Sequence, residues 1–230
     1  MIAKIARVAG RVLPLLAILY ALLVGLGLLL TKVIENSWPI RDEDAVNRAL
    51  AADRTPEMND VTYVLSGLGN TIAIIGAMIV VAIALRLASK RWDLSVFLVL
   101  AVSAQAVVFL LVTLTIDRRR PSVRRLDASP PTSSFPSGHT GAATALFFAS
   151  ALLVLWFVRR RWLKILGITL LVAVPFLVAY GRLYRGMHHP SDIVGSYING
   201  VTCIVIAATS IFGRGGREAE HREERELAAG

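Results

Sequence analysis

The chain of 230 residues is 55% hydrophobic, has a mean hydropathy of +0.62 and carries a formal net charge of +9. This composition is too apolar and too poor in charged side chains for an ordinary soluble domain, and it excludes a soluble enzyme. The sequence therefore predicts an all-α integral membrane protein.

Six apolar windows reach or approach the roughly 20 residues that a helix needs to cross a bilayer. The windows cover residues 13–33, 71–87, 94–116, 140–158, 163–180 and 193–212. We predict a bundle of six transmembrane helices in a single domain over residues 1–212, followed by a charged cytoplasmic tail over residues 213–230. No small-residue cleavage site follows the long first window, so we expect it to remain as a signal anchor.

Lys and Arg residues mark the loops of a membrane protein that stay in the cytoplasm. Basic clusters precede the first window, join the second window to the third and the fourth to the fifth, and follow the sixth. They are Lys4, Arg7 and Arg11; Arg86, Lys90 and Arg91; Arg159, Arg160, Arg161 and Lys164; and Arg214, Arg217, Arg222 and Arg225. We therefore expect both termini in the cytoplasm. Because membrane orientation accounts for most of the positive charge, nucleic acid is a poor explanation for it.

The segment over residues 35–70 is rich in acidic side chains and should lie on the outer surface. Ala45, Leu50 and Ala51 recur at helical spacing, and Thr55-Pro56-Glu57 resembles an N-cap, a first-turn proline and an acidic first turn. The sequence predicts one or two short amphipathic helices here. They would form either a lid that guides a lipid headgroup or a plain interfacial connector.

The connection between the third and fourth windows breaks the charge rule, because it is an outer loop with five arginines. These are Arg118, Arg119, Arg120, Arg124 and Arg125. The loop leads into Pro-Ser-Gly-His, where Ser137 can cap a helix whose first N–H groups bind anions. Gly138 permits close approach of a ligand, and His139 adds a group that titrates near neutrality. The tetrapeptide fits a phosphate site, although alone it also fits a capped transmembrane helix with an incidental interfacial histidine.

The outer connection between the last two windows, residues 181–192, holds two arginines, two histidines and an aspartate. They are Arg182, Arg185, His188, His189 and Asp192. Three of the four histidines of the chain are thus expected at the same membrane face as the five arginines of the outer loop, and only His221 lies elsewhere, in the tail.

These side chains provide the groups that phosphoryl transfer needs. The arginine fork binds phosphate oxygens, a histidine can attack phosphorus if its other ring nitrogen is held, and a second histidine can protonate the leaving oxygen. Asp192 is close in sequence to both His188 and His189, so either could be the held histidine. A His/His/Asp cluster also occurs in metal sites, but a divalent cation beside several arginines is electrostatically unfavourable. We therefore expect no metal. Cys203, the only cysteine, permits neither a disulfide nor a cysteine-based metal site.

Together, the clusters resemble the membrane-bound type 2 phosphatidic acid phosphatase family over roughly residues 70–200. The family's Pro-Ser-Gly-His motif is intact at residues 136–139. Its Ser-Arg, five residues, His, three residues, Asp motif is matched by Arg182, His188 and Asp192, with Gly181 in the Ser place. Its Lys, six residues, Arg-Pro motif is matched by Arg120-Pro121, with Thr113 in the Lys place.

The resemblance implies a metal-independent phosphatase with a phosphohistidine intermediate. His188 would be the nucleophile, Asp192 its orienting partner and His139 the general acid. The phosphate would be bound by Arg120, Ser137, Gly138 and Arg182, with Arg118 as a further candidate. Thr113 removes one cation from the family's phosphate site, and Gly181 removes one hydroxyl.

We expect an outward-facing lipid phosphatase that hydrolyses the terminal phosphate of a lipid phosphate or a polyprenyl diphosphate such as undecaprenyl diphosphate. A lipid phosphotransferase, which would pass the phosphate to another lipid or a sugar, fits the same residues. A non-enzymatic lipid transporter fits less well, because the six apolar windows carry no charge in their middles. The windows consist of generic Leu, Val, Ala and Ile, so they predict neither the lipid nor an oligomeric state.

Overall fold

The computed structural model describes residues 2–128 and 132–213, and within these residues every regular element is a helix. The long helices are α1 (Ile2–Leu28), α4 (Thr71–Ser89), α5 (Trp92–Thr115), α8 (Arg161–Tyr184) and α9 (Pro190–Phe212). Two shorter helices, α6 (Gly138–Ala143) and α7 (Ala149–Phe157), are joined by the π-helical segment Thr144–Phe148 into one continuous span. The helices α2 (Glu43–Ala52) and α3 (Pro56–Gly67) lie between α1 and α4.

Within the described residues, six helices are long and apolar enough to cross a membrane. They are Val8–Val33, Thr71–Ser89, Trp92–Thr115, Gly138–Phe157, Arg161–Tyr184 and Pro190–Phe212. The predicted all-α fold with six spans is therefore confirmed. The first span begins earlier than predicted because the helix runs on through Arg11, whose charge does not interrupt backbone hydrogen bonding.

The predicted short helices between the first two spans are also confirmed. The hydroxyl of Thr55 accepts a hydrogen bond from the Met58 N–H at 3.2 Å, and Pro56 occupies the first turn of α3. This is the N-cap arrangement that the sequence indicated, and it fixes where α3 starts.

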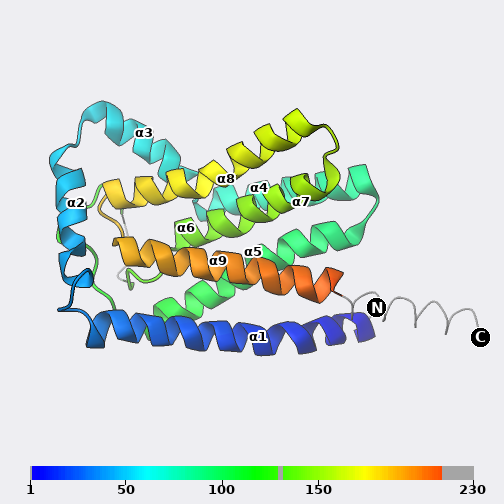
Figure 1. The fold of residues 1–230 in the computed structure, drawn as a ribbon, viewed down its shortest axis with the longest axis horizontal. Helices are drawn as coiled ribbons and strands as arrows, with labels where there is room; N and C mark the ends of the chain where they lie inside the picture. The colour runs from blue at the N-terminus through cyan, green and yellow to red at the C-terminus, as the bar shows by residue number, and fades with distance from the viewer. Residues whose placement is uncertain (1, 129–131, 214–230) are drawn as a thin grey trace, which may run out of the picture.

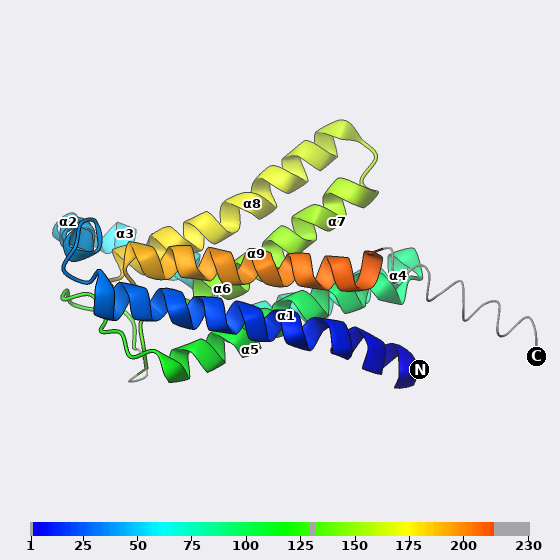
Figure 2. The ribbon, with the colours of Figure 1, turned by 60° about the horizontal axis from the view of Figure 1, so that its bottom comes forward.

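The centre of the bundle is formed by α5 and α9, which pack against each other and bury about half of their spans (50% and 56%). The α4 span is only 6% buried, as expected for a helix that faces lipid. Figures 1 and 2 show α1 along one side of α9 and α7 and α8 on the other, while α6 packs against both α8 and α9. This arrangement places the first turns of α6 and α9 side by side.

The connections between α5 and α6 and between α8 and α9 lie at one end of the bundle, together with α2 and α3 (Figure 1). Helix α1 begins and α9 ends at the opposite end. All of the predicted site residues lie at the α2 end. Apart from Gly213, the predicted charged tail lies outside the described residues.

Candidate active site

The Pro-Ser-Gly-His stretch forms the start of the fourth span. Ser137 is the N-cap of α6, and its Oγ accepts a hydrogen bond from the Thr140 N–H at 3.4 Å. The N–H groups of Gly138 and His139 precede the first intrahelical donors, so they are available to a ligand. A Cβ on Gly138 would lie 2.7 Å from the Phe109 ring, so packing as well as ligand access favours glycine here.

His188 lies in the turn between α8 and α9, where its side chain is almost fully buried. Its Nδ1 lies 2.7 Å from the carbonyl oxygen of Ser134. A carbonyl only accepts hydrogen bonds, so Nδ1 carries the proton and Nε2 keeps its lone pair. Burial lowers the pKa of His188 to about 4, and Arg182 and Arg120 act in the same direction, whereas the negative charge of the nearby Asp192 carboxylate opposes the shift. The ring is therefore neutral at neutral pH, with a free nucleophilic nitrogen.

Asp192 is the most enclosed carboxylate of the site, with an exposed fraction of 0%. Its Oδ2 accepts a hydrogen bond from the His189 N–H at 2.7 Å and lies 3.7 Å from His188 Nδ1 and 3.5 Å from His189 Nδ1. Its Oδ1 accepts a hydrogen bond from Arg118 Nη1 at 2.5 Å. The carboxylate lies between the two histidine rings, and the Ser134 carbonyl is the nearer partner of His188.

Arg120 reaches the site from the loop between α5 and α6, and Arg182 reaches it from the last turn of α8. Nη1 of Arg120 donates to the Met187 carbonyl at 2.7 Å, and Nη1 of Arg182 donates to the Ser66 hydroxyl at 2.9 Å. The Nε atoms of both arginines are buried and have no hydrogen-bond partner among the described residues. A buried guanidinium N–H without an acceptor is costly, and a bound anion would provide one.

His139 completes this group, since its ring lies within electrostatic reach of Arg182, His188 and Arg120. The structure thus brings the predicted residues of both outer connections, between α5 and α6 and between α8 and α9, to one end of the bundle. They are Arg120, Ser137, Gly138, His139, Arg182, His188 and Asp192.

Arg118 lies in a different environment from the other two arginines. Its side chain is 9% exposed, and the guanidinium is held between two carboxylates: Nη2 lies 2.7 Å from Glu43 Oε2, and Nη1 contacts Asp192. Nη1 also donates to the Ser191 hydroxyl at 2.7 Å. Both terminal nitrogens therefore already have anionic partners, which makes Arg118 a poor candidate for binding phosphate.

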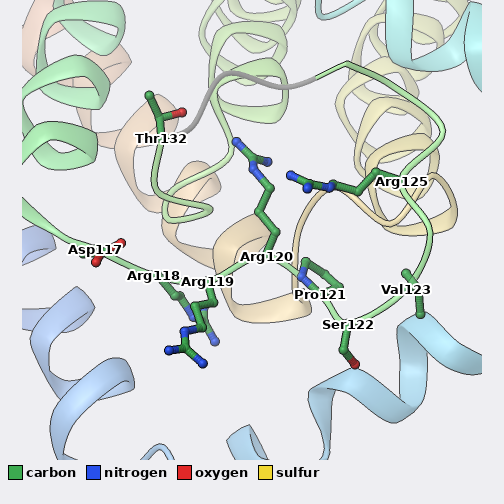
Figure 3. Close-up of a pocket in the computed structure, with 9 residues that line it drawn as sticks. All are labelled: Asp117, Arg118, Arg119, Arg120, Pro121, Ser122, Val123, Arg125 and Thr132. Carbon is green, nitrogen blue, oxygen red and sulfur yellow. The ribbon is translucent and has the colours of Figure 1, made fainter.

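A cavity of about 390 Å³ lies beside Arg120 (Figure 3). It is lined by Asp117, Arg118, Arg119, Arg120, Pro121, Ser122, Val123, Arg125 and Thr132. Figure 3 shows the guanidinium groups of Arg120 and Arg125 pointing toward one another. The arginine side chains that line this cavity make it strongly positive, which favours the binding of an anion.

The sequence did not single out several residues that hold the site together. Asp127 pairs with both Arg182, at 3.0 Å, and Arg185, at 2.6 Å. Glu43 pairs with Arg118, and Ser66 contacts Arg182. The position of Asp127 inside an arginine-rich loop could have indicated its ion pairs with arginine. Nothing in the sequence distinguishes Glu43 and Ser66 from other polar residues of a helix.

The two departures from the family motifs have distinct surroundings. The hydroxyl of Thr113 is buried and has no hydrogen-bond partner among the described residues. A Cβ on Gly181 would lie 3.1 Å from the Ser66 nitrogen and 3.2 Å from the Thr62 carbonyl oxygen. Helix α3 therefore packs directly onto Gly181. In residues 2–128 and 132–213, no group of three or more His, Cys, Asp or Glu side chains is arranged to hold a metal ion.

A model of the PAP2 superfamily matches residues 92–215 of the chain. Among curated relatives, phosphatidylglycerophosphatase B of Bacillus subtilis (strain 168) is 24% identical over 177 residues, which are 76% of this chain and 85% of the relative. Sphingosine-1-phosphate phosphatase 2 of Mus musculus is 40% identical over 74 residues, 32% of this chain and 20% of the relative. An undecaprenyl-diphosphatase of Sulfolobus acidocaldarius is 35% identical over 75 residues, 33% of this chain and 32% of the relative.

Two solved structures have the same fold. A transmembrane PAP2-type phosphatidylglycerolphosphate phosphatase from Bacillus subtilis superposes with a TM-score of 0.69 at 21% identity, covering 82% of this chain and 93% of that one. Aquifex aeolicus LpxE superposes with a TM-score of 0.55 at 22% identity, covering 72% of this chain and 93% of that one.

Proposed function

The chain belongs to the PAP2 superfamily, and on this basis we propose that it is a membrane phosphatase that hydrolyses the terminal phosphate of a lipid phosphate or a polyprenyl diphosphate. The observation that carries the proposal is the state of His188. Its Nδ1–H is engaged by the Ser134 carbonyl, so Nε2 is free to attack phosphorus. The named relatives act on phosphatidylglycerophosphate, sphingosine-1-phosphate and undecaprenyl diphosphate, which share a terminal phosphate on a lipid.

In the proposed first step, His188 Nε2 forms a bond to phosphorus while the bond from phosphorus to the leaving oxygen breaks. His139, acting as an imidazolium, donates a proton to that oxygen, so the leaving oxygen departs as a hydroxyl group of the dephosphorylated lipid. In the second step, His139 takes a proton from water, whose oxygen attacks the phosphohistidine. The bond from Nε2 to phosphorus then breaks, inorganic phosphate leaves, and both histidines return to their starting states.

The phosphate oxygens would be held by the two guanidinium groups and the helix start. The unpartnered Nε–H groups of Arg120 and Arg182 are suitable donors, as are the N–H groups of Gly138 and His139. The hydroxyl of Ser137 caps the same helix start. Because Arg118 already pairs with two carboxylates, we assign it to the support of Asp192 and not to phosphate binding.

We place this site at the outer face of the cell membrane, with both termini in the cytoplasm. The basic clusters predicted to be cytoplasmic support this orientation. The site lies at the end of the bundle opposite to the start of α1 and the end of α9. A lipid substrate could then keep its tail in the bilayer while its phosphate reaches the site.

The test is phosphate release by the purified protein in detergent with EDTA. The substrate panel is phosphatidate, phosphatidylglycerol phosphate and undecaprenyl diphosphate. Turnover should survive EDTA and should be lost in His188→Ala, whereas His221→Ala provides a matched control with a histidine removed from the tail. Full turnover in His188→Ala would overturn the assignment. Phosphate found on an added lipid or sugar acceptor would instead identify a phosphotransferase.

A further inference from the structure

Helix α2 presents three polar side chains to the candidate active site, although it belongs to the connection between the first two spans. They are Glu43, Asp44 and Asn47, which occupy positions i, i+1 and i+4 of the helix. Glu43 and Asn47 are buried, with exposed fractions of 7% and 0%. Asn47 lies four residues after Glu43 and three after Asp44, spacings that make side chains neighbours on a helix, so α2 turns a polar face inward.

Glu43 contacts the first turn of α9 and the arginine-rich loop at once. Its Oε1 accepts a hydrogen bond from the Ser191 N–H at 2.9 Å, and its Oε2 accepts one from the Ser191 hydroxyl at 2.9 Å. The same Oε2 accepts a hydrogen bond from Arg118 Nη2 at 2.7 Å. The carboxylate thus satisfies a free N–H at the start of α9 and pairs with a buried guanidinium.

Arg118 carries the effect of Glu43 to Asp192. Its two terminal nitrogens reach the two carboxylates separately, with Nη2 on Glu43 and Nη1 on Asp192. Because the guanidinium is planar and rigid, the ion pair of Nη2 with Glu43 also fixes the direction in which Nη1 donates to Asp192. Since none of the three side chains is more than 9% exposed, water cannot readily replace a lost partner.

The other two side chains of this face hold neighbouring parts of the site. Nδ2 of Asn47 donates to the carbonyl oxygens of Leu183 and His188, each at 3.1 Å. Asp44 accepts hydrogen bonds from the Ser122 hydroxyl at 2.6 Å and from His189 Nε2 at 3.2 Å. Helix α2 is therefore bonded to the arginine-rich loop, to the histidine turn and to α9.

We propose that Glu43 is a positioning residue of the active site: through Arg118 it orients the Asp192 carboxylate, and through Ser191 it holds the first turn of α9 beside His188. This inference rests on the proposed phosphatase function. It assigns to the segment between the first two spans a clamping role, distinct from both a lid and a passive connector. Glu43 touches none of the proposed phosphate donors, so its role concerns the reaction step and not substrate binding.

The test compares Glu43→Gln with Asp53→Asn. Asp53 follows α2 and is exposed, and its side chain has no hydrogen-bond or ion-pair partner among the described residues, so its variant removes a matched charge. Glu43→Gln should lower kcat about 10- to 100-fold with little change in KM, because a small displacement of catalytic groups has effects of this size. Asp53→Asn should leave both constants at wild-type values. Wild-type kcat in Glu43→Gln, or a loss expressed only in KM, would overturn the proposal.

A double-mutant cycle tests whether Glu43 acts through Arg118. If it does, the loss in kcat of Glu43→Gln combined with Arg118→Gln should be clearly smaller than the product of the two single losses, because coupled side chains give non-additive effects. Multiplying losses would mean that Glu43 acts independently of Arg118, which contradicts the proposed route.

Hydrogen exchange separates a failure of this inference from a failure of the proposed function. Amides of residues 185–192 should exchange faster in Glu43→Gln than in the wild type or in Asp53→Asn, whether or not a substrate is turned over. If the wild type releases phosphate and Glu43→Gln matches it in both rate and hydrogen exchange, the phosphatase function stands and only the positioning role of Glu43 is wrong. If no lipid of the panel is hydrolysed but exchange rises as expected, Glu43 does position the first turn of α9, and it is the proposed phosphatase reaction that is wrong.

Discussion

Nδ1 of His188 lies 2.7 Å from the carbonyl oxygen of Ser134 and 3.7 Å from Oδ2 of Asp192. The proposed nucleophile is therefore oriented chiefly by the backbone of the loop that precedes α6. That loop also leads into Ser137, Gly138 and His139, so the nucleophile and the anion-binding helix start are fixed to each other. Movement of one would move the other, which suits a site where both must contact one phosphate.

The pH dependence of His188 follows from its burial. Its pKa is lowered to about 4, so the ring should stay neutral and nucleophilic down to about that pH. The acid limb of kcat/KM should lie near pH 4, and a histidine NMR titration, assigned with His188→Gln, should give the same midpoint. Because the unfolded chain binds this proton at higher pH, stability should fall as the pH drops from about 6.5 toward 4. A midpoint near 6.5 would mean that the ring is solvated.

Removing the charge of Asp192 should be less damaging than removing the nucleophile. Asp192→Asn leaves the Ser134 carbonyl in place to hold His188, so we expect kcat to fall about 10- to 100-fold. His188→Ala should abolish phosphate release. Single-turnover measurements on both variants check this order, and an equally complete loss in Asp192→Asn would show that the carboxylate is indispensable to the nucleophile.

Arg182→Lys keeps the positive charge but removes the unpartnered Nε–H. Hydrogen bonds to charged groups contribute about 1.5–3 kcal/mol, so kcat/KM should fall about 10- to 100-fold. Arg124→Lys, at an exposed side chain of the arginine-rich loop, is the matched control and should behave as wild type. If both variants keep full kcat/KM, charge alone is sufficient at Arg182.

Thr113→Val tests whether the side chain in the family's Lys place takes part in catalysis. The buried hydroxyl has no partner among the described residues, so its replacement by a methyl group should raise stability by about 1 kcal/mol and leave kcat/KM unchanged. Thermal unfolding in detergent measures the first effect. Thr144→Val is the contrasting control, because the Thr144 hydroxyl donates to the Thr140 carbonyl at 2.7 Å and its loss should destabilise. A drop in kcat/KM for Thr113→Val would assign the hydroxyl to the site.

Gly181→Ser would restore the hydroxyl of the family motif, yet it should not improve the enzyme. The added Cβ would crowd the backbone of α3 at Ser66 and Thr62, and overpacking of this kind costs about 1–3 kcal/mol. The Ser66 hydroxyl already contacts Arg182. Gly76→Ser, where nothing lies within 4 Å of the new Cβ, is the control for a serine in a helix. Higher turnover in Gly181→Ser would show that Ser66 does not replace the missing hydroxyl.

The sequence by itself determined the spans and the local helix starts. A bilayer fixes the length of an apolar helix, so six windows predict six spans whatever their packing. The caps at Thr55 and Ser137 were equally predictable, because each side chain bonds to the backbone of its own first turn. The proximity of Arg120, His139, Arg182 and His188 followed from the placement of their connections at one membrane face.

Only the tertiary structure decided which partner each of these side chains has. His188 and Asp192 are four residues apart, yet the nearest partner of His188 is Ser134 in another connection. Arg118 looked equivalent to Arg120 in sequence, but Glu43 and Asp192 enclose it. Residue type limits what a side chain can bind, whereas the partner it meets depends on how segments distant in sequence pack together. The support that α2 gives to Asp192 is therefore a property of the folded bundle.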